Sequence, residues 1–348
     1  MSGLNTNNAQ RRRLNLEQIL SGAQYPSMGK RRTAIDGSHA GTFECIFDEG
    51  TLHGFIRWLS SPDEPLFWVK GKPGSGKSTL MKVLVTDART QSALAAANPA
   101  CLVISHFFWA AGDDMAKNIR GLLCSLIYQL FVGSGGLGEK VPVDEGGAIL
   151  KPVEEWSERQ LHEVLFWALS EYDIPVVIFL DGIDEVDAGD GNAKLLDLIE
   201  IFCKTEGTKV CVSSRPGKPF KARLLDKPTL KLEDVTRMEI EAYARSQLAR
   251  YYADFAPGEL NDQATVSRLA SHIVNKARGV FLWAALALKG LESGLRSGES
   301  ISQLTERLDL LEPGDVNALY IAMLKRHTGD EETHLKDAAI VLNTVLAY

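Results

Sequence analysis

The sequence contains no apolar run long enough to cross a membrane. A membrane-spanning helix needs about 20 consecutive apolar residues. The strongest candidate, residues 279–295, is shorter than that and includes a lysine and a glutamate. Residues 5–13 are polar and basic, and they lack the apolar stretch of a signal peptide. We therefore expect no membrane span, and no signal peptide is visible.

Cysteine pairs at metal-binding or redox spacing are also missing. The chain has five cysteines, and none of them forms a Cys-x-x-Cys pair. Scattered cysteines argue against a zinc site and against the disulfide framework of a small secreted domain. We therefore expect reduced thiols and a cytoplasmic protein. The cysteines are Cys45, Cys101, Cys124, Cys203 and Cys211.

Positive charge is not in excess. The net charge is −7 and the isoelectric point is about 5.6, which argues against a chain-wide basic surface, so nucleic acid is not expected as a partner. Repeats of ankyrin or TPR length and sustained heptads are absent as well. The 348 residues, of which 45% are hydrophobic and 24% charged, are typical of a globular protein of about two or three domains.

The clearest motif lies between residues 66 and 82. Residues 66–69 are apolar and predict a short buried strand, and apolar residues at helical spacing begin at Leu80. Between them the pattern G-x-x-x-x-G-K-[ST] is matched at every fixed position, in the strand–loop–helix context that it requires. We therefore favour a phosphate-binding loop over a Gly-rich turn that binds nothing. The loop comprises Gly71, Lys72, Pro73, Gly74, Ser75, Gly76, Lys77 and Ser78, and Thr79 follows.

The residue types of this loop explain its chemistry. Glycines let the backbone curl so that successive N–H groups point at phosphate oxygens, and the following helix adds the partial positive charge of its N-terminus. Lys77 would reach the β- and γ-phosphates, and Ser78 would place its hydroxyl on Mg²⁺. The loop therefore predicts binding of a nucleotide with Mg²⁺.

A second motif, PVVIFLDGIDEVD, covers residues 175–187. Its apolar run predicts a doubly buried strand, and Asp181 follows the last apolar residue directly. This is the Walker B arrangement, in which a strand delivers a carboxylate to the edge of the sheet near Mg²⁺. Asp184 or Glu185 could then orient or deprotonate a water molecule. Acidic residues after a strand can also merely cap a turn, but their occurrence downstream of a phosphate-binding loop favours the Walker B interpretation.

A third polar cluster ends the apolar run 209–212. Ser213, Ser214 and Arg215 follow it, and then a proline. An arginine at the carboxyl end of a strand can sense a γ-phosphate, and the alternative is a surface arginine beside a turn. The local sequence leaves both interpretations open.

The apolar patterns together predict an α/β fold. Strands alternate with helices as far as residue 232, which is typical of a parallel sheet with helices on both faces and a ligand at the carboxyl ends of the strands. Residues 1–13 are polar and expected to be disordered, and the Gly- and Pro-rich stretch 133–152 is expected to be a long exposed loop. The predicted strands are 66–69, 100–109, 176–180, 209–214 and 229–232, and the predicted helices are 43–59, 116–131, 157–172 with Ser157 as N-cap, and 193–204.

From Thr236 onward the pattern is helical throughout. Apolar residues recur at helical spacing and predict a separate α-helical region. The chain stops within an apolar helix, which suggests a fragment or a shortened gene model. The predicted helices are 238–252, 266–276, 279–295, 301–311, 315–327 and 333–348.

Several segments together resemble the NACHT class of STAND NTPases, specifically the nephrocystin-3-like N-terminal domain of filamentous fungi. The resemblance extends over roughly residues 28 to 348, and the sequence FLDGIDE around Asp181 is its most specific part. The segments that carry it are 67–82, 107–109, 121–130, 179–185, 210–216 and 277–284, with Arg32, Ile35, His39, Thr42 and Phe43 upstream and Leu319, Tyr320, Met323 and Leu324 downstream.

This resemblance implies a P-loop NTPase sheet followed by a helical lid. It implies a short segment 1–27, a nucleotide-binding domain 28–234, a lid 235–312 and the start of a winged-helix-like region 313–348. It also implies a switch between an ADP form and an ATP form, with self-association or other signalling proteins as partners. GTP is not distinguished from ATP. The implied site consists of 71–79 for phosphate, Ser78 and Asp181 for Mg²⁺, Lys77, Asp184, Glu185 and Arg215 for catalysis, and residues near 35–42 for the base.

Three functions compete at this point. The first is a slow signalling NTPase whose bound nucleotide sets its conformation. The second is a nucleotide-binding scaffold or interaction module with little or no hydrolysis. The third is a motor-type or kinase-type P-loop protein, which the acidic isoelectric point and the lack of an acceptor-binding motif disfavour. A Glu185→Gln substitution separates the first from the second, because it should trap ATP only in the hydrolysing protein.

Overall fold

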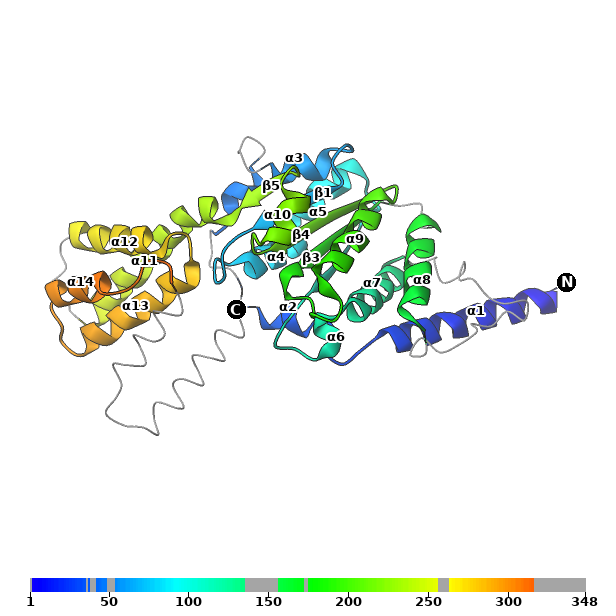
Figure 1. The fold of residues 1–348 in the computed structure, drawn as a ribbon, viewed down its shortest axis with the longest axis horizontal. Coiled ribbons are helices and arrows are strands. Elements are labelled where there is room, and N and C mark those ends of the chain that lie inside the picture. The colour runs from blue at the N-terminus through cyan, green and yellow to red at the C-terminus, as the bar shows by residue number, and fades with distance from the viewer. Residues whose placement is uncertain are drawn as a thin grey trace. The chain divides into compact units, whose positions relative to one another are not determined.

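The structure is a computed structural model, and it describes residues 2–35, 37, 42–48, 54–134, 156–171, 175–255 and 263–315 (Figure 1). The chain divides into two compact units. The first, here called the sheet unit, comprises Met1–Asp36, Phe47–Val69 and Met81–Leu230. The second, here called the lid unit, comprises Gly37–Ile46, Lys70–Leu80 and Lys231–Tyr348. The phosphate-binding loop thus groups with the C-terminal helices.

A five-stranded parallel sheet forms the centre of the sheet unit (Figure 1). Its strand order is β2-β3-β4-β1-β5, so β1 is separated from β3 by β4. The register pairs Leu180 of β3 with His106 of β2 and with Val212 of β4. The strands are β1 (Leu66–Lys70), β2 (Leu102–Phe107), β3 (Val176–Asp181), β4 (Thr208–Ser214) and β5 (Thr229–Lys231), and each overlaps a strand predicted from the sequence.

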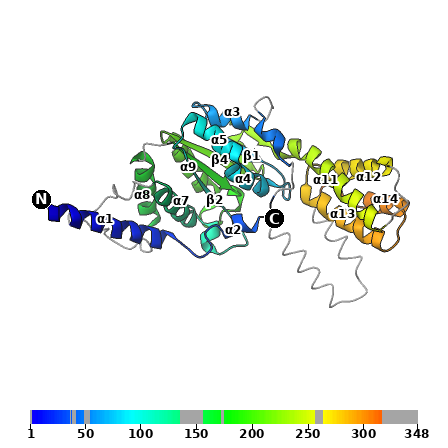
Figure 2. The ribbon, with the colours of Figure 1, turned by 180° about the vertical axis from the view of Figure 1, so that it is seen from behind.

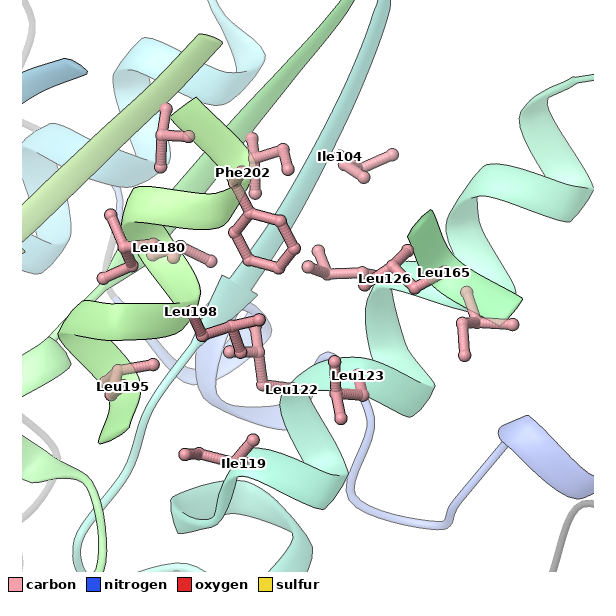
Figure 3. Packing of buried hydrophobic residues seen from close by; sticks show 14 of the residues in the cluster. Ile104, Ile119, Leu122, Leu123, Leu126, Leu165, Leu180, Leu195, Leu198 and Phe202 are labelled. Atoms are coloured by element: carbon pink, nitrogen blue, oxygen red, sulfur yellow. The ribbon is translucent and has the colours of Figure 1, made fainter. Parts of the chain in front are cut away.

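One face of the sheet is covered by three helices. They are α7 (Ile119–Gly133), α8 (Glu158–Glu171) and α9 (Gly191–Lys204). Alternate residues of a strand point to opposite faces, and the even-numbered residues 176, 178 and 180 of β3 belong to the buried cluster under these helices. Figure 3 shows leucines of α7, α8 and α9 meeting Ile104 of β2 and Phe202 of α9.

The opposite face carries an aromatic group. Phe67 of β1 lies 5.3 Å from Trp58 and 5.7 Å from Phe55, measured between ring centroids. Both partners belong to α3 (Phe55–Ser60), which packs beside α5 (Ala88–Ala97) (Figure 2). The buried sulfur of Met81 lies 3.9 Å from that of Cys211 on β4. Helices therefore cover both faces, and the predicted α/β class, a parallel sheet with helices on both faces, is confirmed.

The outer edge of β2 is closed by a side chain. Gln129 of α7 accepts a hydrogen bond from the backbone N–H of Ser105 at 3.0 Å and donates one to the carbonyl of Ser105 at 2.8 Å. Its amide group thus occupies the place that a neighbouring strand would take, because the N–H and C=O of one residue point to the same side of a strand.

Two predictions about the first 60 residues were wrong. The expected disordered residues fall within α1 (Ser2–Ala23), whose second half buries Ile19 and Ala23 in the core beside α7. Tertiary packing at one end therefore supports a helix whose start is polar. The expected helix 43–59 is a 3₁₀ turn, Glu44–Phe47, and then α3, which begins after Gly54 in a left-handed conformation with φ 65°.

Several other predictions lie outside the described residues. These are most of the loop 133–152, the helices 315–327 and 333–348, and most of the segment 35–42. Short helices that the sequence reasoning did not predict connect the main elements of the sheet unit, and the predicted N-cap Ser157 is confirmed by its hydrogen bond from Gln160 N at 3.3 Å. The other helices of this unit are α2 (Lys30–Ala34), α6 (Asp114–Lys117), the 3₁₀ helix η4 (Ile183–Glu185) and α10 (Lys218–Leu224). The helix predicted after the phosphate-binding loop is α4 (Lys77–Thr86), which begins in the lid unit and continues in the sheet unit.

The C-terminal half of the lid unit is helical in its described part. It consists of α11 (Leu232–Phe255), α12 (Gln263–Ala277), α13 (Phe281–Arg296) and α14 (Ile301–Asp309). Fully buried Trp283 donates its indole N–H to the carbonyl of Glu312 at 2.9 Å, and Ser300 and Gln303 form a capping box that starts α14. None of the helices in the described ranges, including α13, is both long and apolar enough to span a membrane.

The core of the sheet unit leads to a stability prediction. Leu126 of α7 is fully buried, and its truncation leaves a cavity, so Leu126→Ala should lower the free energy of unfolding by about 2–5 kcal/mol. Leu14→Ala is the control, because Leu14 is 53% exposed and should change stability by no more than about 0.5 kcal/mol. Urea denaturation followed by circular dichroism measures both. Equal losses in the two variants would contradict this packing.

Candidate functional site

Asp181 ends a strand in which every residue is buried. Its side chain is 1% exposed, and its Oδ1 accepts a hydrogen bond from the hydroxyl of Ser213 at 2.5 Å. The same hydroxyl oxygen accepts a bond from the backbone N–H of Gly182 at 2.9 Å. Burying a carboxylate costs free energy unless polar partners surround it. Ser213, at the end of the neighbouring strand β4, supplies one such partner and also fixes the residue after Asp181.

The turn after β3 brings Glu185 back toward the end of β2. Gly182 has φ 67°, a left-handed conformation that favours glycine. The carboxylate of Glu185 then accepts the backbone N–H of Ala110 at 2.9 Å. Burial raises the pKa of the Glu185 carboxyl, and the carboxylates of Asp181 and Asp184 raise it further. A carboxyl group with a raised pKa accepts a proton more readily, as a general base must.

Asp184 and Arg215 form an ion pair. The Nε atom of Arg215 lies 3.2 Å from Oδ2 of Asp184, and the backbone N–H of Arg215 donates to Oδ1 at 3.0 Å. The Asp184 side chain is 12% exposed, whereas that of Arg215 is 55% exposed. The predicted acidic and basic groups after β3 and β4 therefore meet, and part of the guanidinium remains accessible.

The phosphate-binding loop follows β1 directly and leads into α4. Gly74 and Gly76 have φ 67° and 95°, so the loop depends on the left-handed conformations that glycine allows. The ammonium group of Lys77 lies back over the loop and donates to the carbonyls of Gly71 and Lys72, both at 2.9 Å. Ser78 and Thr79 lie in the first turn of α4, where backbone N–H groups have no partner within the helix and favour anions.

Residues of the C-terminal helices hold the backbone of this loop. The N–H of Lys72 donates to Glu233 of α11 at 2.7 Å, and the carbonyl of Gly74 accepts the N–H of Leu282 of α13 at 2.9 Å. A Cβ at position 74 would lie 2.9 Å from Cβ of Leu282. Gly74 is therefore required both for its dihedral angles and for close packing. Gly71 is restricted as well, because a Cβ there would lie 2.6 Å from the hydroxyl of Ser75.

The predicted site residues thus form two groups. Asp181, Asp184, Glu185 and Arg215 belong to the sheet unit, and the loop residues as far as Leu80 belong to the lid unit. Both groups offer the oxygen ligands that Mg²⁺ prefers, the hydroxyl of Ser78 and the carboxylate of Asp181. In the described ranges no group of three or more His, Cys, Asp or Glu side chains could hold a metal ion by itself. Mg²⁺ bound with one or two protein ligands plus phosphates does not need such a group.

Two residues of these groups have functions that the sequence pattern alone does not predict. Ser213 is part of a predicted polar cluster, and its place at the end of the strand beside the Walker B strand is the signal that could have identified it. Glu233 gives no such signal, because its partner Lys72 is distant in the chain and uses a backbone N–H.

The chain is similar in sequence to a known family and to a fungal protein. The family model described as nephrocystin 3, N-terminal, matches residues 41–215. The vegetative incompatibility protein HET-E-1 of Podospora anserina is 25% identical over 288 residues, which cover 80% of this chain and 20% of that protein. The chain therefore spans about a fifth of the length of this relative. A structure of Drosophila ORC bound to DNA matches 82% of this chain and 66% of that chain, with a TM-score of 0.47 and 14% identity, and so remote a likeness carries no functional inference.

The first prediction from this site concerns Ser213. Ser213→Ala leaves Asp181 without this donor and Gly182 without its acceptor, so the free energy of unfolding should fall by about 1–3 kcal/mol. Ser92→Ala, at an exposed position of α5, is the matched control and should change stability by less than about 0.5 kcal/mol. Chemical denaturation of both variants measures the difference. A Ser213→Ala variant as stable as the control would show that the hydroxyl is dispensable.

The second prediction concerns the pH dependence that Glu185 contributes. Its pKa is raised in the folded state, so the folded chain binds more protons than the unfolded chain at pH values above the ordinary pKa. Stability therefore falls as the pH rises through that window. Glu185→Gln removes this penalty and should be more stable than the wild type at neutral pH, with the gain lost below about pH 4. Thermal unfolding at a series of pH values measures the difference in stability between Glu185→Gln and the wild type. Glu206→Gln, at an exposed position, is the control. A gain in stability that does not change with pH would show that the raised pKa of Glu185 is not its cause.

Proposed function

The chain belongs to the nephrocystin 3 N-terminal family of NACHT-like STAND NTPases, and from this premise we propose that it is a slow, Mg²⁺-dependent purine-nucleotide switch. The chain has a NACHT-like nucleotide-binding domain of the P-loop NTPase type. One observation carries the proposal. The loop 71–78 has left-handed glycines, and the ammonium of Lys77 lies over its carbonyls. That arrangement places a cation beside the loop and the N-terminus of α4, both of which favour phosphate oxygens.

Mg²⁺ would be held by Ser78 and Asp181 together with the phosphates. Their oxygen atoms suit this hard cation, and the bound ion would neutralise charge on the β- and γ-phosphates. Asp181 is kept at the end of β3 by Ser213. We assign this residue to the metal because it is the carboxylate delivered directly by the strand.

Hydrolysis would use the residues around Glu185. Its carboxylate is held by the N–H of Ala110, and burial raises its pKa, which suits a residue that takes a proton from the attacking water. Asp184 holds Arg215 by the ion pair, and the accessible part of the Arg215 guanidinium supports its role as the sensor of the γ-phosphate. Lys77 would stabilise the charge that develops on the transferred phosphate.

The switch would act through the backbone of the loop. Because Glu233 and Leu282 bond to Lys72 and Gly74, a nucleotide that shifts the loop also shifts the ends of α11 and α13. Bound ADP and ATP would therefore favour different lid conformations, in proportion to the difference in their affinities. Self-association or binding of other signalling proteins would be the outcome. ATP is the first nucleotide to test, with GTP beside it.

A nucleotide-binding scaffold with little or no hydrolysis is the second candidate. Two observations favour it: Arg215 is engaged by Asp184, and the carboxylate of Glu185 is engaged by a backbone N–H. If both groups keep these partners with nucleotide bound, neither acts on the γ-phosphate. Binding would then stabilise the fold without turnover.

The nucleotide content of the purified protein tests binding. Denaturation of the wild type should release ADP or ATP, and Lys77→Ala should lose it, because the substitution removes the cation over the loop. Lys289→Ala is the control, since this lysine is exposed on α13, and it should retain the nucleotide. A wild type that is free of nucleotide and shows no thermal shift with Mg-ATP or Mg-GTP would contradict the proposal.

Single-turnover hydrolysis separates the two candidates. In a slow NTPase, Glu185→Gln should lower the hydrolysis rate by about 10²–10⁴-fold and leave ATP bound. In a scaffold, the wild type and Glu185→Gln should both retain unhydrolysed ATP at equal levels. The comparison is made at saturating Mg-ATP, with Glu206→Gln as the matched variant.

A further inference from the structure

A cavity lies in the sheet unit, beside the edge strand β2. Its volume is about 670 Å³, within the range of about 300–1,000 Å³ that small-molecule sites occupy. The segment between α1 and α2, the end of β2 and one side of α7 form its walls. The lining residues used below are Tyr25, Arg31, Arg32, His106, Tyr128 and Gln129.

The charged side chains that line this cavity are arginines, and acidic groups lie behind its wall. Arg31 and Arg32 both line it, and no aspartate or glutamate does so among the described residues. Behind the wall, Asp113 accepts a hydrogen bond from the hydroxyl of Ser27 at 2.8 Å. Burial raises the pKa of Glu185, and the charge of Arg31 opposes that rise.

Arg31 is 5% exposed and lies over the ring of Trp109 at 5.9 Å. Arg32 donates from Nη1 to the hydroxyl of Ser105 at 3.1 Å, and within the described part of the chain it forms no salt bridge. A guanidinium carries five N–H donors, so Arg32 has donors left for a ligand.

The other polar groups of the wall are neutral. His106 is 4% exposed, and burial lowers its pKa to about 3, so the imidazole carries no charge near neutral pH. Its Nε2 is buried and has no hydrogen-bond partner among the described residues. Burial also raises the pKa of Tyr25, whose phenol therefore stays protonated. The cavity combines arginine side chains with neutral hydrogen-bonding groups and aromatic residues, among them Tyr25 and Tyr128.

We propose that this cavity binds a small organic phosphate monoester. The phosphate would lie against Arg32, and the organic part would pack against Tyr25 and Tyr128. A phosphate monoester carries close to two negative charges at neutral pH, and a guanidinium group binds such oxygens with paired donors.

This site is separate from the phosphate-binding loop. The loop continues β1, whereas the cavity adjoins β2, and the strand order places β3 and β4 between these strands. Neighbouring strands are about 4.8 Å apart, so β1 and β2 are separated by roughly 14 Å. No residue of the loop 71–78 lines the cavity among its described residues. The proposal therefore does not depend on nucleotide binding.

Calorimetric titration with phenyl phosphate tests the proposal. The probe should bind the wild type and Lys77→Ala with the same affinity, because Lys77 belongs to the other site. Arg32→Met should weaken it by about ten-fold or more, as expected for the loss of charge-assisted hydrogen bonds. Arg159→Met is the control, since this arginine is exposed on α8. Met28→Trp, which fills the cavity from its wall, should also abolish binding and covers the case in which Arg32→Met does not fold.

Three further probes test which parts of phenyl phosphate the cavity recognises. Phenol and inorganic phosphate should each bind more weakly than phenyl phosphate, and benzoate, with one charge, should also bind more weakly. Equal binding of phenol, benzoate or inorganic phosphate would overturn the assignment to a phosphate monoester. Three results would overturn the site itself. The first is loss of phenyl phosphate binding in Lys77→Ala, and the second is equal affinity in Arg32→Met and Arg159→Met. The third is no binding to the wild type at millimolar phenyl phosphate.

Discussion

A charged side chain at the end of an apolar strand is the constraint on which the rest of this chain depends. Asp181 is buried after residues that are all buried, and it is tolerated because Ser213 of the adjacent strand donates to it. This contact requires β3 and β4 to be paired in one register. A slip by one residue would turn Ser213 to the opposite face of the sheet. The position of the Asp181 carboxylate and the packing of the core therefore both depend on the same register of β3 and β4.

A different constraint, the lack of space around the backbone, restricts the glycine-rich loop. Gly74 is approached by Leu282, and the loop N–H of Lys72 is taken by Glu233. The loop is thus packed by the helices that follow the sheet in the chain. Its glycines are needed for tight packing as well as for dihedral angles, and any ligand that contacts the loop backbone also bears on α11 and α13.

Much of this arrangement could be predicted from the sequence, because it depends on short-range patterns. Apolar runs located all five strands, and the spacing of Gly71, Gly76 and Lys77 identified the loop. Two kinds of feature were missed. The polar first half of α1 was expected to be disordered, whereas Leu14 to Leu20 were expected to form helical turns. The helix is stabilised by packing of Ile19 and Ala23 in the core, which no local pattern shows. Glu233 and Gln129 bond to backbone groups of residues that are distant in the sequence. Every residue type other than proline carries the same backbone groups, so the sequence does not reveal these contacts.

The amide of Gln129 has a consequence for the solution behaviour of the chain. β2 is the last strand on its side of the sheet, and an open edge of this kind offers N–H and C=O groups to any extended peptide. By bonding to both groups of Ser105, Gln129 imitates the missing neighbour and withdraws the middle of the strand from such pairing. Gln129 therefore disfavours pairing of this edge with the edge strand of another chain, and so disfavours aggregation.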